Sequence, residues 1–397
     1  MKPPSGNDSH PERSRPFPTP DQELLLAACL LKGDAALAAF EQWPCRDDLD
    51  SVDAGSYRLL PLLYRNVRGL EVQAPILERL KGVHRRTWYK NQLLFRRTAG
   101  AVGALKEARI DTLVHKGAVL AVQWYDDVGA RPMADVDVLV PTACAVDAFE
   151  VLEGLGWRSP SRNLHHLLRA CAGVDLVSND GFRLDLHWHL LSECLEPDAD
   201  AEFWERSLPI EFSGVDTRTL EPADQLLQVL AHGCSWNAMA PLRWVADSVI
   251  LVEGAASQLD WSRLVEQGRR RRLTCVLHHM LGYLHRRWRV PVPHEVLDEL
   301  KRLPVASWEG REFWFRQRTG PDTLWGIVPL QWYRYRRLTS GTGGRSHVFG
   351  FARFLQWSAG LESLWQVPSF VASKLIRRLW LFAVYWERRL VGSVSGS

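Results

Sequence analysis

Asp135 and Asp137 lie one residue apart in the otherwise apolar segment ADVDVLVP. In a β-strand, residues i and i+2 point to the same face, so the two carboxylates would share one face while the valines fill the core on the other. A buried carboxylate without a partner is costly. The pair therefore requires a cation or hydrogen-bond donors close by.

A second apolar segment, FRLDLHW, repeats this alternation and would place Arg183, Asp185 and His187 on one face. If that face meets the aspartates of the first segment, three carboxylates come together, which their mutual repulsion forbids without cations. Hard oxygen ligands of this kind favour Mg²⁺ or Mn²⁺. Such ions stabilise the attacking and leaving oxygens of phosphoryl transfer, which is the chemistry that these residues predict.

Two cations and a glycine are placed to contact phosphate. Lys116 ends the preceding predicted strand, Arg131 comes just before the aspartates, and Gly117 would let a phosphate approach the backbone and the next helix. The competing interpretation is structural: Arg131 or Arg183 would form salt bridges with the aspartates, and Lys116 would pair with one of them.

The histidines admit two interpretations. We expect His187 to hydrogen-bond a neighbouring carboxylate and orient it. A zinc site of His187, His189 and Asp185 is the alternative, although the segment lacks the helical spacing of common zinc ligands. Three further polar residues on predicted helices either line the acceptor side of a cleft or hold the helices together: His232, Arg243 and Asp247.

The elements that must position these residues form an α/β unit over about residues 110–215. Hydrophobic periodicity and turn residues predict the following order: a strand over 111–117, a helix over 118–129 closed by Gly129, a strand over 134–141, a helix over 142–156 with Thr142 as N-cap and Gly156 as stop, and a hairpin around Asn179-Asp180-Gly181. Helical periodicity flanks this unit over residues 21–109 and 216–303, after a Pro/Ser-rich disordered tail over 1–20.

The chain of 397 residues has an ordinary composition, with 46% hydrophobic and 24% charged residues, and its seven cysteines form no C-x-x-C pair. Without a cleavable apolar leader or a long apolar run, we expect a cytoplasmic protein that does not cross a membrane. The C-terminal region 304–397 is rich in Trp and Arg: from residue 305 on it holds 13 Lys and Arg against 5 Asp and Glu. It is expected to be helical, with arginines lying over its own aromatic core.

These segments resemble a known family. LVHKGAVLAVQWYDDVGARPMADVDVLV, followed by RLDLHWHL, looks like the uncharacterised bacterial nucleotidyltransferase family of the DNA polymerase β superfamily, and EPADQLLQVLAHG, LRWVADSVILV and LDWSRL resemble its helical region. The resemblance covers roughly residues 85–300. It implies an α/β (α+β) fold, a small mixed sheet with helices, flanked by N-terminal and C-terminal helical regions.

The resemblance also implies Mg²⁺-dependent (or Mn²⁺-dependent) transfer of a nucleoside monophosphate from an NTP to an acceptor, with release of pyrophosphate. Asp135 and Asp137 would be the metal-binding pair and Asp185 the third carboxylate, either a ligand or a base. Lys116 and Gly117 stand where the superfamily usually has a Gly-Ser phosphate loop.

Two alternatives stay open. The chain could be a catalytically inactive module of the same fold that binds a nucleotide or a partner. It could also work through its basic, aromatic C-terminal region, resting on a membrane surface or gripping a protein. The acceptor is unknown, either a small molecule or a protein, and we do not expect nucleic acid as a partner, because the arginine run at 269–272 is typical of a solvated helix end.

Overall fold

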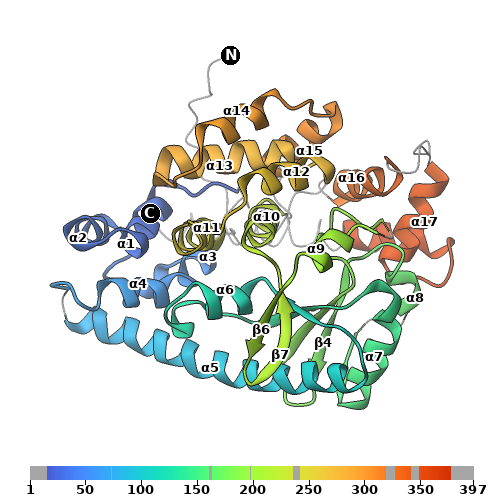
Figure 1. Cartoon of the computed structure of the whole chain (residues 1–397), viewed down its shortest axis with the longest axis horizontal. Helices are drawn as coiled ribbons and strands as arrows, with labels where there is room; N and C mark the ends of the chain where they lie inside the picture. The colour runs from blue at the N-terminus through green and yellow to red at the C-terminus, as the bar shows by residue number, and fades with distance from the viewer. Residues whose placement is uncertain are drawn as a thin grey trace, which may run out of the picture.

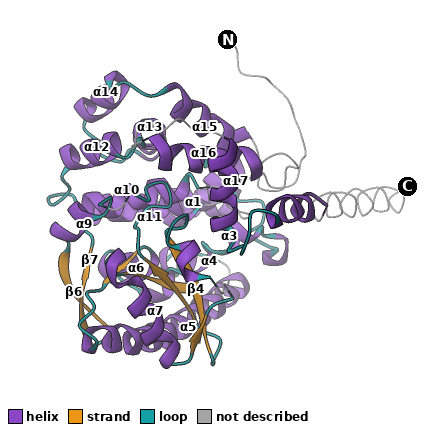
Figure 2. Cartoon of the chain, turned by 90° about the vertical axis from the view of Figure 1, so that its right-hand side faces the viewer, coloured by secondary structure: helices purple, strands orange, loops and turns teal. Residues whose placement is uncertain are grey.

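The computed structural model describes residues 16–72, 74–160, 163–196, 198–235, 242–318, 327–340 and 348–376. These residues form one mixed sheet with helices on both sides (Figure 1). In Figures 1 and 2 the sheet lies between α5 and α7 below it and α10 and α11 above it. The expected α/β fold with helical regions before and after the sheet is confirmed.

The described strands are β1 (Leu113–His115), β2 (Asp135–Leu139), β3 (Trp157–Arg158), β4 (Gly173–Ser178), β5 (Arg183–His187), β6 (Leu208–Phe212) and β7 (Val215–Thr219). Their order in the sheet is β3-β4-β5-β2-β1-β7-β6. Strand β2 is central: it pairs antiparallel with β1 and parallel with β5. The hairpins β4–β5 and β6–β7 complete the two sides.

The helices precede and follow the sheet along the chain. The N-terminal helices are α1 (Pro20–Leu30), α2 (Gly33–Gln42), α3 (Ala54–Tyr57), α4 (Leu60–Val67) and the long α5 (Ala74–Glu107). Those within the α/β unit are α6 (Gly117–Gln123), α7 (Ala145–Gly154), α8 (Leu164–Leu167) and α9 (Ala201–Glu205). Those after it are α10 (Pro222–Gly233), α11 (Arg243–Gly254), α12 (Trp261–Arg270), α13 (Thr274–Trp288), α14 (His294–Arg302), α15 (Ser307–Arg318), α16 (Ile327–Ser340) and α17 (Val348–Ser358).

The two faces of β2 have different surroundings, as its alternation predicts. Val136 and Val138 are buried in a cluster with apolar residues of α5 and α7. Leu139, on the face of the aspartates, belongs instead to the cluster that includes α10 and α11. The carboxylate face therefore looks toward the C-terminal helices.

The predicted order of strand, helix, strand, helix and hairpin is confirmed, and Gly181 takes the left-handed backbone (φ +83°) that the hairpin turn needs. The helix predicted over 118–129 is too long. It ends at Gln123, because Trp124 and Tyr125 turn inward and bond to α10 and α11. Gly129 is not its cap but lies in a separate 3-10 helix.

The second predicted helix is also corrected at its start. Residues Thr142–Cys144 form a 3-10 turn, and the Thr142 hydroxyl donates to the backbone oxygen of Trp188 (2.9 Å) instead of capping α7. Gly156, with φ +85°, follows the end of α7 as expected. Strands β3, β6 and β7 were not expected, and β7 carries the sheet past residue 215 to Thr219.

The two ends of the chain lie partly outside the described residues. Of the predicted tail, residues 1–15 are outside, while Phe17 packs on Trp244 and Tyr283 (ring centroids 6.3 and 5.1 Å apart). Residues 377–397 of the Trp/Arg-rich region also lie outside. Within the described part of the chain, no helix has the length and apolar character that a membrane span requires.

Candidate active site

A cavity of about 400 Å³ opens between the carboxylate face of the sheet and helices α10 and α11. Its lining includes all the predicted catalytic and phosphate-contacting residues: Lys116, Gly117, Arg131, Asp135, Asp137 and Asp185. His232 on α10 also lines it, whereas Arg183 and His187 do not. The chain thus brings residues between 55 and 247 to one cavity.

The strand register brings the three predicted carboxylates together. Asp137 of β2 is paired directly with Asp185 of the parallel strand β5. Residues paired across a ladder point to the same face, with strands roughly 4.8 Å apart. Asp135, two residues before Asp137, shares this face, so all three carboxylates meet at the cavity wall.

The three carboxylates differ in charge. Burial, together with Asp137 and Asp135, raises the pKa of Asp185 to about 8, and its buried Oδ1 has no hydrogen-bond partner. Burial and Asp137 also raise the pKa of Asp135. Burial would do the same to Asp137, but the Lys116 ammonium and a hydrogen bond from His187 hold its pKa well below the ordinary value. Negative charge is therefore costly at Asp135 and Asp185 unless a cation joins them.

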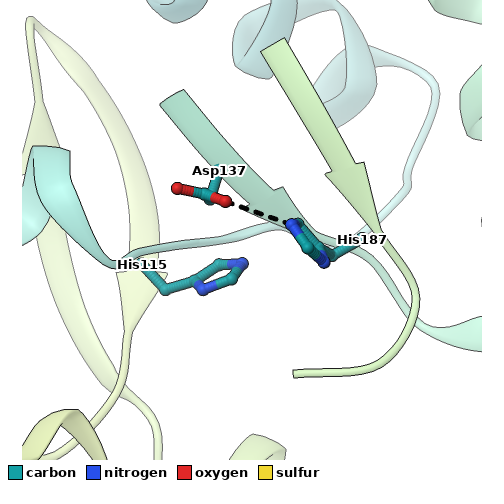
Figure 3. A group of neighbouring side chains, drawn as sticks. All are labelled: His115, Asp137 and His187. Atoms are coloured by element: carbon teal, nitrogen blue, oxygen red, sulfur yellow. Dashed lines mark hydrogen bonds and ion pairs between the residues drawn. The ribbon is translucent and has the colours of Figure 1, made fainter. Parts of the chain in front are cut away.

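Lys116 and two histidines lie around Asp137, and Figure 3 shows the two histidines, His115 and His187, beside it. Lys116 pairs with Asp137 Oδ1 and lies 3.1 Å from His187 Nε2, which is itself 3.1 Å from Asp137 Oδ1. His115, paired with Asp137 across β1 and β2, is buried and takes a hydrogen bond from Gln228 (2.8 Å). The predicted orienting contact of His187 is present, and so is the alternative ion pair of Lys116.

His115, Asp137 and His187 offer ligand atoms within 4.8 Å of one another and form a group that could hold a metal ion. Burial and the charge of Lys116 lower the pKa of both imidazoles, so both are neutral near pH 7. Lys116 already brings positive charge to this group, so we interpret it as a support that fixes Asp137. The contacts of Asp137 with Lys116 and His187 both use Oδ1.

The alternative zinc site of His187, His189 and Asp185 is not formed. Strand β5 ends at His187, so the alternation that would bring His189 to the same face stops there. His189 is buried and bonds Asp200 (2.7 Å).

In a comparison with models of protein families, the chain matches the model of an uncharacterised nucleotidyltransferase family over residues 54–289. That range is more than half of the chain and contains every residue of the cavity named above. The chain belongs to this family. The resemblance in the α/β motifs is thereby confirmed, and no curated protein matches the chain.

The three carboxylates of this family member fit a hard divalent ion. Asp135 forms no hydrogen bond or ion pair with any described residue, and the Oδ1 of Asp185 is buried without a partner. Two of the three neighbouring carboxylates therefore have no cation as partner. Clustered carboxylate oxygens are the ligands that Mg²⁺ and Mn²⁺ prefer.

Arg131 does not brace the aspartates, contrary to the structural interpretation. It donates to both oxygens of Asp247 on α11 (Nε–Oδ1 and Nη2–Oδ2, both 2.8 Å), and Tyr125 donates to the same carboxylate (2.7 Å). Arg183 likewise pairs with Asp175 (3.5 Å) rather than with Asp135 or Asp137. Asp247 is thus part of the site's frame, in agreement with the packing role considered for it.

Gly117 has a structural reason to be glycine. A β-carbon there would collide with the Arg131 guanidinium and lie 3.3 Å from Met133 Cγ. The preceding Lys116 takes φ +53°, a strained conformation for a residue with a side chain. The Lys-Gly turn therefore fits Arg131 against the backbone and aims Lys116 at Asp137.

Two more arginines line the cavity, Arg58 just after α3 and Arg243 at the start of α11. Arg243 donates to the backbone oxygen of Pro132, and neither arginine forms an ion pair with a described carboxylate. Arg58 and His115 were not predicted as site residues from the sequence. Arg58 lies outside the segments that resemble the family, and the position of His115 beside Asp137 follows only from the register of β1 against β2.

Proposed function

We propose that the protein is a metal-dependent nucleotidyltransferase that transfers a nucleoside monophosphate from an NTP to an acceptor and releases pyrophosphate. The observation that carries this proposal is the set of three carboxylates, paired across β2 and β5, that faces one cavity in a chain of a nucleotidyltransferase family. The buried, unpartnered oxygen of Asp185 supports a cation among them.

Asp135, Asp137 and Asp185 would hold Mg²⁺ or Mn²⁺. When bound, the ion would neutralise phosphate oxygens and stabilise charge on the leaving group. An acceptor oxygen forms a bond to the α-phosphorus of the NTP, the bond between the α-phosphorus and the bridging oxygen breaks, and pyrophosphate leaves with that oxygen.

The remaining residues prepare these carboxylates. Lys116 keeps Asp137 ionised, and His187 orients it. Asp185 lies beside the metal-binding pair and, if it does not serve as a ligand, is placed to take the proton of the acceptor hydroxyl once a bound cation keeps it ionised. Arg131, held by Asp247, packs against the Lys-Gly turn at the cavity wall.

The proposal is tested by incubating the protein with Mg²⁺, NTPs labelled at the α-phosphate and cell extract, and by following labelled product and pyrophosphate. We expect labelling by the wild type and none by Asp137→Asn. Asp175→Asn is the matched control, because Asp175 lies on the neighbouring strand β4, paired with Asp185, but does not line the cavity. Labelling by a folded Asp137→Asn protein equal to that by the wild type would refute the proposal.

An inactive module of the same fold predicts a different result. Such a protein would bind NTP with Mg²⁺ in calorimetry and release no pyrophosphate with any extract.

A further inference from the structure

We propose that Arg58 and Arg243 form an anion site that binds the polyphosphate chain of the nucleotide beside the carboxylates. This inference rests on the proposed function and deepens it, because it moves the principal phosphate contacts from Lys116 and Arg131 to a pair of arginines on two other elements.

The charge pairing in the cavity separates its cations into two classes. Lys116 is paired with Asp137 and Arg131 with Asp247, so their charges are already compensated. Arg58 and Arg243 line the same cavity and have no carboxylate partner among the described residues. Two guanidinium groups are thus left for an anion that comes from outside the chain.

The backbone before Arg58 and the side chain of Arg243 are both fixed by hydrogen bonds. Asp53 caps α3 by accepting from the backbone of Gly55 (2.8 Å) and Ser56 (2.9 Å), and Arg58 follows directly at the end of that turn. Arg243 is anchored through Pro132, in the loop that leads to Asp135. One turn later on α11, Asp247 accepts a hydrogen bond from Arg131. The Arg243 guanidinium therefore needs little ordering when a ligand binds, and the Arg58 side chain starts from a fixed backbone position.

The electrostatics of the free protein favour an added anion. Burial and the charges of Arg131 and Arg58 lower the pKa of Arg243 to about 9. Burial and Arg131 also lower the pKa of Arg58. A negatively charged ligand between these cations would relieve this repulsion.

A polyphosphate fits this arrangement better than a single carboxylate does. A guanidinium binds two phosphate oxygens at once through its fork of N–H groups, and a chain of phosphates can meet two arginines and the neighbouring carboxylate-bound ion together. The cavity, of about 400 Å³, is within the usual range for a site of this kind.

The test is calorimetric titration of the full chain with inorganic tripolyphosphate, without divalent ions, and separately with ATP and Mg²⁺. We expect Arg58→Gln and Arg243→Gln each to weaken tripolyphosphate binding by roughly tenfold to a hundredfold, the usual loss for a charged hydrogen-bonding partner. Arg68→Gln is the matched control: Arg68 lies exposed at the end of α4, away from the cavity lining, and its variant should bind as the wild type does.

The outcomes separate this inference from the proposed function. Unchanged tripolyphosphate affinity in both variants, or no binding by the wild type, overturns the arginine site even if ATP turnover is intact. Loss of tripolyphosphate binding in the variants, with no ATP binding or pyrophosphate release by the wild type, keeps the anion site and removes the nucleotide. Arg243→Lys is the second variant, for the case in which Arg243→Gln does not fold. It keeps the positive charge but loses the paired N–H donors of the guanidinium, so its affinity for tripolyphosphate should be intermediate.

Discussion

Replacing Asp185 with Asn should make the metal-free protein more stable, although the residue lies at the centre of the proposed site. Asp185 is partly buried beside two other carboxylates, and its Oδ1 has no partner. Asn has nearly the same shape, carries no charge and can donate to a neighbouring carboxylate. The substitution therefore removes a repulsion and creates no cavity.

The size and pH dependence of the effect follow from the pKa of Asp185, which rises from 3.8 to about 8 in the folded protein, first through burial. A raised folded pKa means that the contribution of this group to stability is complete below pH 3.8 and is lost as the pH rises through about 8. At 1.36 kcal/mol per pKa unit, the loss reaches at most about 4 kcal/mol at pH 7 and about 2 kcal/mol at pH 5. The advantage of Asp185→Asn should thus grow by about 2–3 kcal/mol between these values.

The assay is urea unfolding of the wild type and Asp185→Asn at pH 5 and pH 7, with a chelator present. Asp175→Asn serves as the control, since Asp175 is exposed and its removal only eases the repulsion on Asp185 slightly. A variant that is less stable than the wild type at pH 7, or whose advantage is the same at both pH values, would show that the three carboxylates do not repel one another as described.

Two further substitutions test the frame of the site. Asp247→Asn leaves the buried Arg131 charge without its partner and should lower the free energy of unfolding by about 3–5 kcal/mol, measured by urea unfolding at pH 7. Because the pKa of Asp247 is lowered by Arg131 despite burial, the contribution of this pair is present above pH 3.8 and is lost as the pH falls below it, so wild type and variant should converge in acid. Gly117→Ala should destabilise by about 1–3 kcal/mol, because its β-carbon meets Arg131, whereas Gly82→Ala in open space on α5 should stabilise slightly; equal effects of the two substitutions would refute the packing of Arg131 on Gly117.

The face on which each predicted site residue lies could be predicted from the sequence, because alternation in a strand is local. Asp135 and Asp137 against the valines, and Asp185 within its hairpin, follow from a period of two and one turn. The parallel register that pairs Asp137 with Asp185 joins residues far apart in the chain, and no local pattern encodes it.

The ion-pair partners of the site residues were harder to predict than the strand face on which each residue lies. The sequence offers Arg131 and Arg183 as neighbours of the aspartates, but Arg131 bonds to Asp247, which is 116 residues away. The early end of α6 has the same origin, since Tyr125 turns inward to that carboxylate. Tertiary partners decided both outcomes, and the roles predicted for the site residues stay predictions.

The alternative role of the C-terminal region also stays a prediction. Trp365 is 91% exposed and Phe349 80% exposed, but most of the basic, aromatic segment SKLIRRLWLFAVYWERRLV lies outside the described residues. Deleting residues 305–397 and measuring association with liposomes and RNA would test it.

The central claim is most directly tested by the affinity for Mn²⁺ in the presence of ATP, measured by electron paramagnetic resonance on the wild type, Asp135→Asn and Asp175→Asn. The account predicts that the wild type and Asp175→Asn bind the ion equally well and that Asp135→Asn binds it at least about tenfold more weakly, the loss of one charged ligand. Equal affinity in all three proteins would contradict it.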